Sequence, residues 1–342
     1  MAHPHFPETQ PYQAQEVQTN QEQRAAGDNH VGGTLDSKPG EAQAAARIAQ
    51  TDGKAMENTG LLPKVEFMGD RGLFGSPSAD DKKMFDDLDA IAKRSGAPAL
   101  TSEQKFDILM MSSSEKQMYR FAIDELQKLA DNKISPADYM SDNLRKAASL
   151  AEANGRAPGS WNIFKPTSQE LYVDYVSQTF CDHSLGMAKD AARGLAGSPV
   201  SPAGIALEEN YSALIKGRAD QGFNPNVVDV DKSNSVTHHY REVMMVGYNS
   251  GIYMADKATA YLDKADENPG DVRNGYFAAM LGSALWHEKI TPTEAANLTI
   301  WAYTNHGGTQ PPWGNSNEKG HYVETKDYYL NPWLKAYHSR QD

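Results

Sequence analysis

The fold class is decided by residues 79–96, which read ADDKKMFDDLDAIAKRSG. The large apolar side chains recur at the spacing of one helix face: Met84, Phe85, Leu88 and Ile91. Gly96 follows them and is typical of a helix end. The stretch therefore predicts a helix that buries one face and exposes its charged side chains.

Other apolar stretches follow a Ser or Thr that suits the start of a helix. Thr101 and Gln104 form a capping box, in which each side chain bonds to the other residue's backbone. Pro136 and Pro292 each follow a Ser or Thr and suit the first helical position. Further helices are expected at 114–131, 168–190, from Ser201 onward, and at 237–265, 272–288 and 292–304. Strand-like alternation is absent, so we predict an all-α globular domain of about eight to ten helices.

Composition divides the chain into three parts. Residues 1–77 are expected to be a flexible, disordered polar leader and linker, because they contain too little apolar surface to offset the entropy cost of ordering. Two prolines and two glycines at 153–166 mark a boundary. It separates an N-terminal helical subdomain, 78–155, from a C-terminal helical domain, 160–342, which carries the candidate site and ends in an aromatic-rich tail, 305–342.

Charge and composition exclude several classes of protein. The formal net charge of −12 repels phosphate backbones, so nucleic-acid binding is not expected. The single cysteine, Cys181, excludes an intramolecular disulfide and a cysteine-rich zinc site. No apolar run approaches the ~18 residues of a membrane span, and the first residues lack the features of a Sec-type signal. We expect a protein made in the cytoplasm that, if secreted, leaves by a route that does not use such a signal.

Two histidines, an arginine and a glutamate open an apolar stretch at residues 236–251, VTHHYREVMMVGYNSG. His238 and Glu242 are four residues apart and share a helix face, with Arg241 beside them. A histidine and a carboxylate at this spacing can form an acid/base pair or hold a divalent metal ion. The alternative is an ordinary helix start, with Thr237 or Ser235 as N-cap and Glu242 paired with Arg241 or His238.

A third ionisable group precedes the helix expected at 272–288. Asp271 is either the N-cap of that helix or the third member of a reactive cluster, in which Asn274 and Arg241 would position a substrate. Glycines in this helix and in the stretch 236–251 allow the two backbones to approach closely. A parallel or steeply crossed pair brings the two N-terminal ends together, whereas an antiparallel pair separates them.

Three further residues are candidate substrate-binding groups. His183 lies within an apolar stretch, where the alternative is a hydrogen-bonded core histidine. His306 precedes two glycines that would make a ligand-facing turn. Trp313 belongs to the aromatic tail, whose rings either clamp the tail to the body or stack on a sugar ring.

At the level of class, this plan resembles bacterial secretion-system effectors and polymorphic toxins. Such proteins pair a disordered polar leader lacking a Sec signal with a compact helical toxin domain. The matching features are the leader, the stretch 236–251, and residues 268–282, NPGDVRNGYFAAMLG. The resemblance implies a secreted effector whose partners include a secretion apparatus or an immunity protein. The chain lacks the Cys and His ligand sets of zinc-type nuclease toxins, which speaks against a nuclease.

Three functions remain open. The first is a toxin-like hydrolase that acts on a cell-envelope polymer, a glycan, with Glu242 as general acid and with His238 and Asp271 completing the cluster. The second is a non-enzymatic binding or structural protein, such as a virion or secretion-apparatus component. The third is a metal-dependent phosphodiesterase or lipase with a divalent ion at His238 and Glu242. No other cofactor is expected.

Overall fold

The computed structural model describes residues 77–156, 165–180, 201–228, 236–237, 240–249, 251, 269–304 and 330–339. All of them belong to one compact unit, Phe67–Asp342. Within these ranges the chain forms helices and two isolated bridges, and no strand. The prediction of an all-α domain is confirmed for this part of the chain. The predicted leader up to Ser76 and residues 305–329 of the predicted tail lie outside the described ranges.

Helix α2 (Ala79–Ser95) has the limits that its sequence predicts. At its start, the Ser78 hydroxyl accepts a hydrogen bond from the backbone N–H of Asp81, whose carboxylate accepts from the Ser78 N–H at 3.0 Å. At its end, Gly96 adopts a left-handed φ of 82° that suits a residue without a Cβ. Between these caps, the face that carries Leu88 is buried. Local residues therefore set both ends of this helix.

Five more of the described helices begin with the same reciprocal capping box: α3 (Ser102–Met110), α4 (Ser113–Ala130), α5 (Pro136–Asn154), α6 (Ser168–Thr179) and α11 (Pro292–Tyr303). Helix α8 (Pro202–Ile215) starts differently, because Asp107 of α3 accepts from the backbone N–H of Ala203 at 3.0 Å. Each cap satisfies N–H groups that have no partner within the helix.

One predicted helix limit is wrong. The helix expected at 168–190 ends at Thr179, because Phe180 leaves the helical region with φ −114° and ψ 39°. The Phe180 ring is only 1% exposed and meets the ring of Tyr139 edge-on at 6.1 Å. Burial of this ring in the core accompanies the departure from helical geometry.

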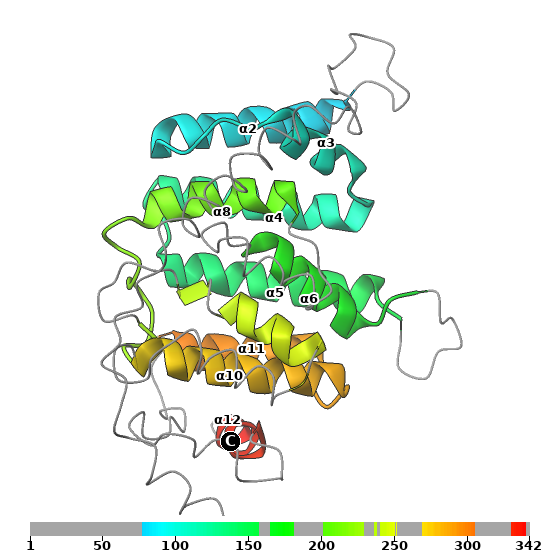
Figure 1. Cartoon of the computed structure of the whole chain (residues 1–342), viewed down its shortest axis with the longest axis vertical. Helices are drawn as coiled ribbons and strands as arrows, with labels where there is room; N and C mark the ends of the chain where they lie inside the picture. The colour runs from blue at the N-terminus through cyan, green and yellow to red at the C-terminus, as the bar shows by residue number, and fades with distance from the viewer. Residues whose placement is uncertain are drawn as a thin grey trace, which may run out of the picture. The chain divides into compact units, whose positions relative to one another are not determined.

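The helices form stacked layers, with α2 and α3 followed by α4 and α8, and then by α5 and α6 (Figure 1). Helices α10 (Pro269–Trp286) and α11 make the next layer, and α12 (Leu330–His338) lies beyond them (Figure 1). Helix α5 contacts α4, α6 and α11, so it packs against helices on both sides of the boundary predicted near residue 155. The division into two helical subdomains stays a prediction.

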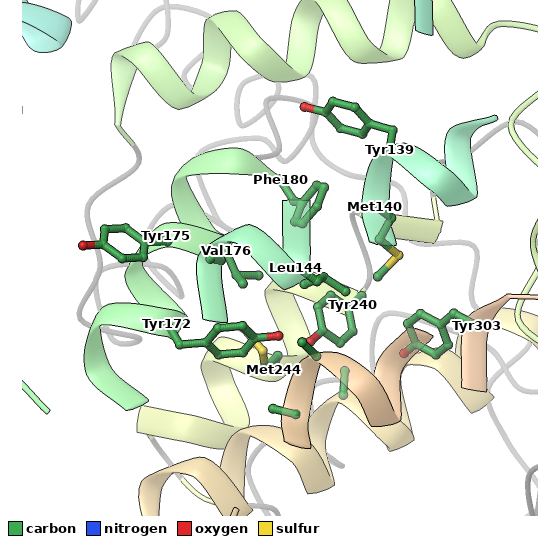
Figure 2. Packing of buried hydrophobic residues seen from close by; sticks show 14 of the residues in the cluster. Tyr139, Met140, Leu144, Tyr172, Tyr175, Val176, Phe180, Tyr240, Met244 and Tyr303 are labelled. Carbon is green, nitrogen blue, oxygen red and sulfur yellow. The ribbon is translucent and has the colours of Figure 1, made fainter. Parts of the chain in front are cut away.

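The core is rich in tyrosine. Seven tyrosines in the described ranges are at most 2% exposed: Tyr119, Tyr139, Tyr172, Tyr175, Tyr211, Tyr240 and Tyr303. In Figure 2 the hydroxyls of Tyr172 and Tyr240 point toward one another. The Tyr240 hydroxyl lies 3.2 Å from that of Thr299, and its ring meets Tyr303 edge-on at 5.4 Å. These phenols combine a large apolar area with a polar atom that needs a partner inside the protein.

Residues 240–249, here called helix 240–249, approach α10 through glycines. A Cβ built on Gly247 would lie 2.5 Å from the carbonyl oxygen of Ala279. A Cβ on Gly282 would lie 2.0 Å from the carbonyl oxygen of Met244. Both distances are far shorter than a van der Waals contact, so only residues without a side chain fit at these positions.

The same contacts show the direction of the two segments. The side-chain amide of Asn274 donates to the carbonyl oxygen of Val236 at 2.9 Å. The start of one segment therefore lies beside the start of the other. Eight residues further along each segment, Met244 lies against Gly282. The segments therefore run the same way, and of the two arrangements left open by the sequence the parallel one is found.

Candidate active site

The predicted site residues fall partly outside the described ranges. His238, His183, His306 and Trp313 all lie there. The backbone of Asp271 belongs to the first turn of α10, but its side chain is likewise outside the description. Among the described residues, no three His, Cys, Asp or Glu side chains converge to hold a metal ion.

Asn274, predicted to bind substrate, is fully buried. Besides its bond to the Val236 carbonyl, its side-chain oxygen accepts from the Tyr303 hydroxyl at 2.7 Å. These bonds tie the start of the stretch 236–251 to α10 and α11. Asn274 therefore has a structural role, and it has no exposed surface that could contact a substrate.

Arg241 and Glu242 lie on different sides of helix 240–249. Arg241 is 2% exposed, and its Nε has no hydrogen-bond partner. Glu242 is half-buried and shares the more open side of the helix with Val246 and Asn249. Tyr248 lies on the opposite, buried side, near α6.

A second group of carboxylates lies where α4 meets α6. Glu115, in the capping box of α4, accepts from the Ser112 N–H at 2.7 Å and from the side-chain amide of Gln178 at 3.0 Å. Asp174 lies one turn before Gln178 on α6 and is close enough to Glu115 for the two charges to interact. The two carboxyl groups thus come from different helices and occupy one surface.

The surroundings shift the pKa values of these two carboxyl groups in opposite directions. Although Asp174 reaches solvent, the protein around it removes water from the carboxyl, and the charges of Glu115 and Glu170 add to this effect. Together they raise the pKa of Asp174 from 3.8 to about 6. Burial alone would raise the pKa of Glu115, but hydrogen bonds from Ser112 and Gln178 lower it overall. Opposed shifts of this kind are typical of acid/base pairs.

A buried phenol faces this pair. Tyr175 is 0% exposed, and its hydroxyl lies near the side chain of Ser114 at the start of α4. In Figure 2 it points away from Tyr172 and Tyr240. Burial raises the pKa of Tyr175, as do the nearby charges of Glu115 and Asp174. The Tyr175 hydroxyl therefore lies near both carboxyl groups, whose charges act on it.

Two aromatic rings meet where helix 240–249 packs on the end of α10. Trp286, at the end of α10, is 55% exposed, and its ring meets that of Tyr248 edge-on at 5.4 Å. Burial raises the pKa of Tyr248, and the charges of Glu170, Asp174 and Glu288 raise it further. Tyr248 therefore links the exposed tryptophan to the carboxylates of α6. We call this set the α6 site: Glu115, Glu170, Asp174, Tyr175, Tyr248, Trp286 and Glu288.

Sequence reasoning missed the α6 site, although its signals are visible. Glu115 and Glu170 each follow a Ser or Thr by three residues, which indicates only a helix cap. Asp174 is one turn after Glu170 and shares its face. What the sequence lacks is any sign that the start of α4 lies against α6.

No described helix is both long and apolar enough to cross a bilayer. Comparison of the chain with protein-family models, curated proteins and solved structures finds no match. The α6 site is therefore interpreted from its own residues.

Proposed function

We propose that the chain is a secreted, effector- or toxin-like hydrolase that cleaves a cell-envelope glycan by general acid/base chemistry at the α6 site. The observation that carries this proposal is the placement of Asp174 and Glu115, two carboxyl groups from different helices that lie close enough for their charges to interact. Glycoside hydrolysis needs such a pair, one group to give a proton and one to accept it.

Asp174 is the acid and Glu115 the base in this proposal. The proton of Asp174 passes to the glycosidic oxygen as the bond from that oxygen to the anomeric carbon breaks. Glu115 takes a proton from a water molecule, whose oxygen bonds to the same carbon. Each product chain gains one hydroxyl end, and proton exchange with solvent restores both carboxyl groups. The assignment follows from the raised pKa of Asp174 and the lowered pKa of Glu115.

Trp286 provides the binding surface for a sugar ring in this mechanism. Its ring is exposed and is supported edge-on by Tyr248. Aromatic faces suit the apolar faces of sugar rings. Export without a Sec-type signal, and recognition by a secretion apparatus or an immunity protein, remain parts of the proposal that rest on the class resemblance.

The test is hydrolysis of purified cell-wall glycan by the full chain, measured as loss of turbidity. Replacing Asp174→Asn removes the proton donor and should lower the rate by at least about 100-fold. Asp124→Asn, at an exposed position of α4, is the matched control and should leave the rate unchanged. Full activity of a folded Asp174→Asn protein would remove Asp174 from the mechanism. Loss of activity in Glu242→Gln alone would return the acid role to Glu242.

The pH dependence of the rate gives a second test. The base must be ionised, so the rate should rise as pH passes the lowered pKa of Glu115, below 4.5. The acid must be protonated, so the rate should fall as pH passes about 6, the pKa of Asp174. A rate that keeps rising through neutral pH would contradict this pairing.

A non-enzymatic binding or structural role is the second candidate. It is supported by the burial of predicted site residues, since Asn274 is 0% and Arg241 2% exposed. It is also supported by the tail, where Trp333 of α12 is 5% exposed and packs on Phe277 at 4.7 Å, as a clamp would. Under this candidate, light scattering should reveal an oligomer, and the α6 variants should not affect it.

A further inference from the structure

We infer that Gln178 is a positioning residue, whose side-chain amide fixes the carboxylate of Glu115, the proposed base, on the side of α6. In this role Gln178 acts only through Glu115. The inference rests on the proposed function, because it adds a residue to the same site.

Both oxygens of the Glu115 carboxylate accept a hydrogen bond. Oε2 accepts from the backbone N–H of Ser112 at 2.7 Å, the bond that completes the capping box of α4. Oε1 accepts from the side-chain amide of Gln178, on α6, at 3.0 Å. Because the two donors come from different parts of the fold, the carboxylate cannot rotate without losing one of them. The two bonds therefore fix its orientation, with Oε1 facing α6.

The bond from Gln178 is not needed to cap α4. A capping box is complete when the carboxylate accepts from the N-cap N–H. Glu170 and Glu294 do this for α6 and α11, and the described hydrogen bonds include none from a second helix to either carboxylate. Of these three capping glutamates, Glu115 is the one that has a described bond from another helix. The additional donor therefore distinguishes the carboxylate assigned as base from an ordinary cap.

Gln178 also determines where the base lies relative to the acid. Asp174 is one turn before Gln178, so the two side chains lie on the same face of α6. The bond from Gln178 to Glu115 thus brings the base to the face that carries the acid. An amide suits this position, because it stabilises the ionised base and, being uncharged, does not favour ionisation of the acid beside it.

The test is Gln178→Leu in the full chain, which nearly keeps the size of the side chain and removes the donor. The carboxyl carbon of Glu115 is titrated by NMR, and hydrolysis of cell-wall glycan is measured against pH. The pKa of Glu115 should rise, because the bond from Gln178 lowers it. The rising limb of the rate should move to higher pH with it, and the rate at the optimum should fall roughly tenfold. The falling limb, set by Asp174 at about pH 6, should stay in place.

A purely structural role of Gln178 predicts a different result. Loss of its hydrogen bond would then lower the stability of the fold, and with it the rate, but neither limb would move. Denaturant titration shows whether the variant is folded at the pH of each measurement. A rate that falls while the rising limb stays in place would overturn the inference.

Gln178→Lys restores a donor and adds a charge. The pKa of Glu115 should stay low in this variant, and the rising limb should stay in place. The falling limb should move to lower pH, because the ammonium group is one turn from Asp174 and favours its ionised form. A rising limb displaced as far as in Gln178→Leu would overturn the inference, since the donor would then not be the cause.

Gln127→Leu, on α4, is the matched control. The Gln127 amide also donates to a carboxylate, that of Asp131, at 3.0 Å, but at an exposed position away from Glu115. Its loss should leave the pKa of Glu115 and both limbs unchanged. A displacement equal to that of Gln178→Leu would overturn the inference, because it would show that any lost amide has this effect.

The NMR titration separates this inference from the proposed function, because it needs no substrate. If the unchanged chain does not hydrolyse glycan but Gln178→Leu raises the pKa of Glu115, the placement of Glu115 by Gln178 is upheld and the enzyme is rejected. If glycan is hydrolysed and the pKa of Glu115 does not move in Gln178→Leu, the enzyme is upheld and the inference is overturned.

Discussion

Helices α2 and α10 are nearly equal in length, at 17 and 18 residues, but they are held in different ways. Helix α2 has a capping box, a left-handed glycine at its end and one buried face. In α10, every residue from 274 to 282 is buried. An amphipathic helix is specified by its own periodicity, whereas a helix buried all round is placed by the elements that surround it.

The largest expected effect comes from the glycine contact of α10. A Cβ at Gly282 would lie 2.0 Å from a backbone oxygen of helix 240–249, and a backbone atom cannot rotate away. Gly282→Ala should therefore lower the free energy of unfolding by at least about 4 kcal/mol in denaturant titrations.

Gly96→Ala in the α2 region is the matched control. A Cβ there meets nothing within 4 Å, so only the left-handed backbone, with φ 82°, opposes the change. The expected loss is about 1 kcal/mol. Equal losses for the two glycines would contradict the distinction between the two helices.

The buried face of α2 gives the next effect. Leu88 is 0% exposed, and Leu88→Ala should lower the free energy of unfolding by about 3 kcal/mol, because it removes buried methyl groups and leaves a cavity. Asp86→Ala, on the exposed face of the same helix, should change it by less than about 0.5 kcal/mol. Similar losses at both positions would mean that α2 does not bury one face.

Capping should have a smaller effect. The Ser135 hydroxyl accepts from the Asp138 N–H at 3.1 Å at the start of α5. Ser135→Ala should lower the free energy of unfolding by about 1 kcal/mol, and Ser135→Asn, which keeps an acceptor, should lower it much less. If both variants unfold at the same denaturant concentration, the cap does not stabilise α5.

The smallest effect concerns Asp174, whose pKa is raised from 3.8 to about 6 by folding. Folding therefore favours the protonated form, and stability present below pH 3.8 is lost as pH rises through 6. Asp174→Asn should remove this loss, so the variant should gain about 0.5 kcal/mol at pH 7.5 relative to pH 3.5, a small value because solvent screens an exposed carboxyl. An equal gain at both pH values would exclude the titration of Asp174 as its cause.

Most helix starts could be predicted from the sequence, because a capping box is formed by residues three positions apart. Thr101 was identified in this way, and Pro136 and Pro292 were identified as prolines that follow a Ser or Thr. The structure has helix starts at all three. The end of α6 was missed, since Phe180 leaves helical geometry where its ring packs against a residue of another helix.

The candidate site was less predictable than the fold. The sequence suggested Arg241 and Asn274 as site residues. Polar residues in an apolar stretch can instead contribute to the packing of the core, and both of these side chains are buried. Glu115 and Asp174 are 59 positions apart, and each alone resembles an ordinary surface or capping residue. Their opposed pKa shifts come from neighbours that only folding brings together.

The amino-acid sequence by itself determined the helical class, most helix starts and the buried face of α2, because these depend on residues within one or two turns of each other. Only the tertiary structure decided that helix 240–249 runs parallel to α10 and that α4 meets α6 at two carboxyl groups. The physical reason is that helix direction and the pKa of a side chain depend on contacts between distant segments, which no local pattern encodes.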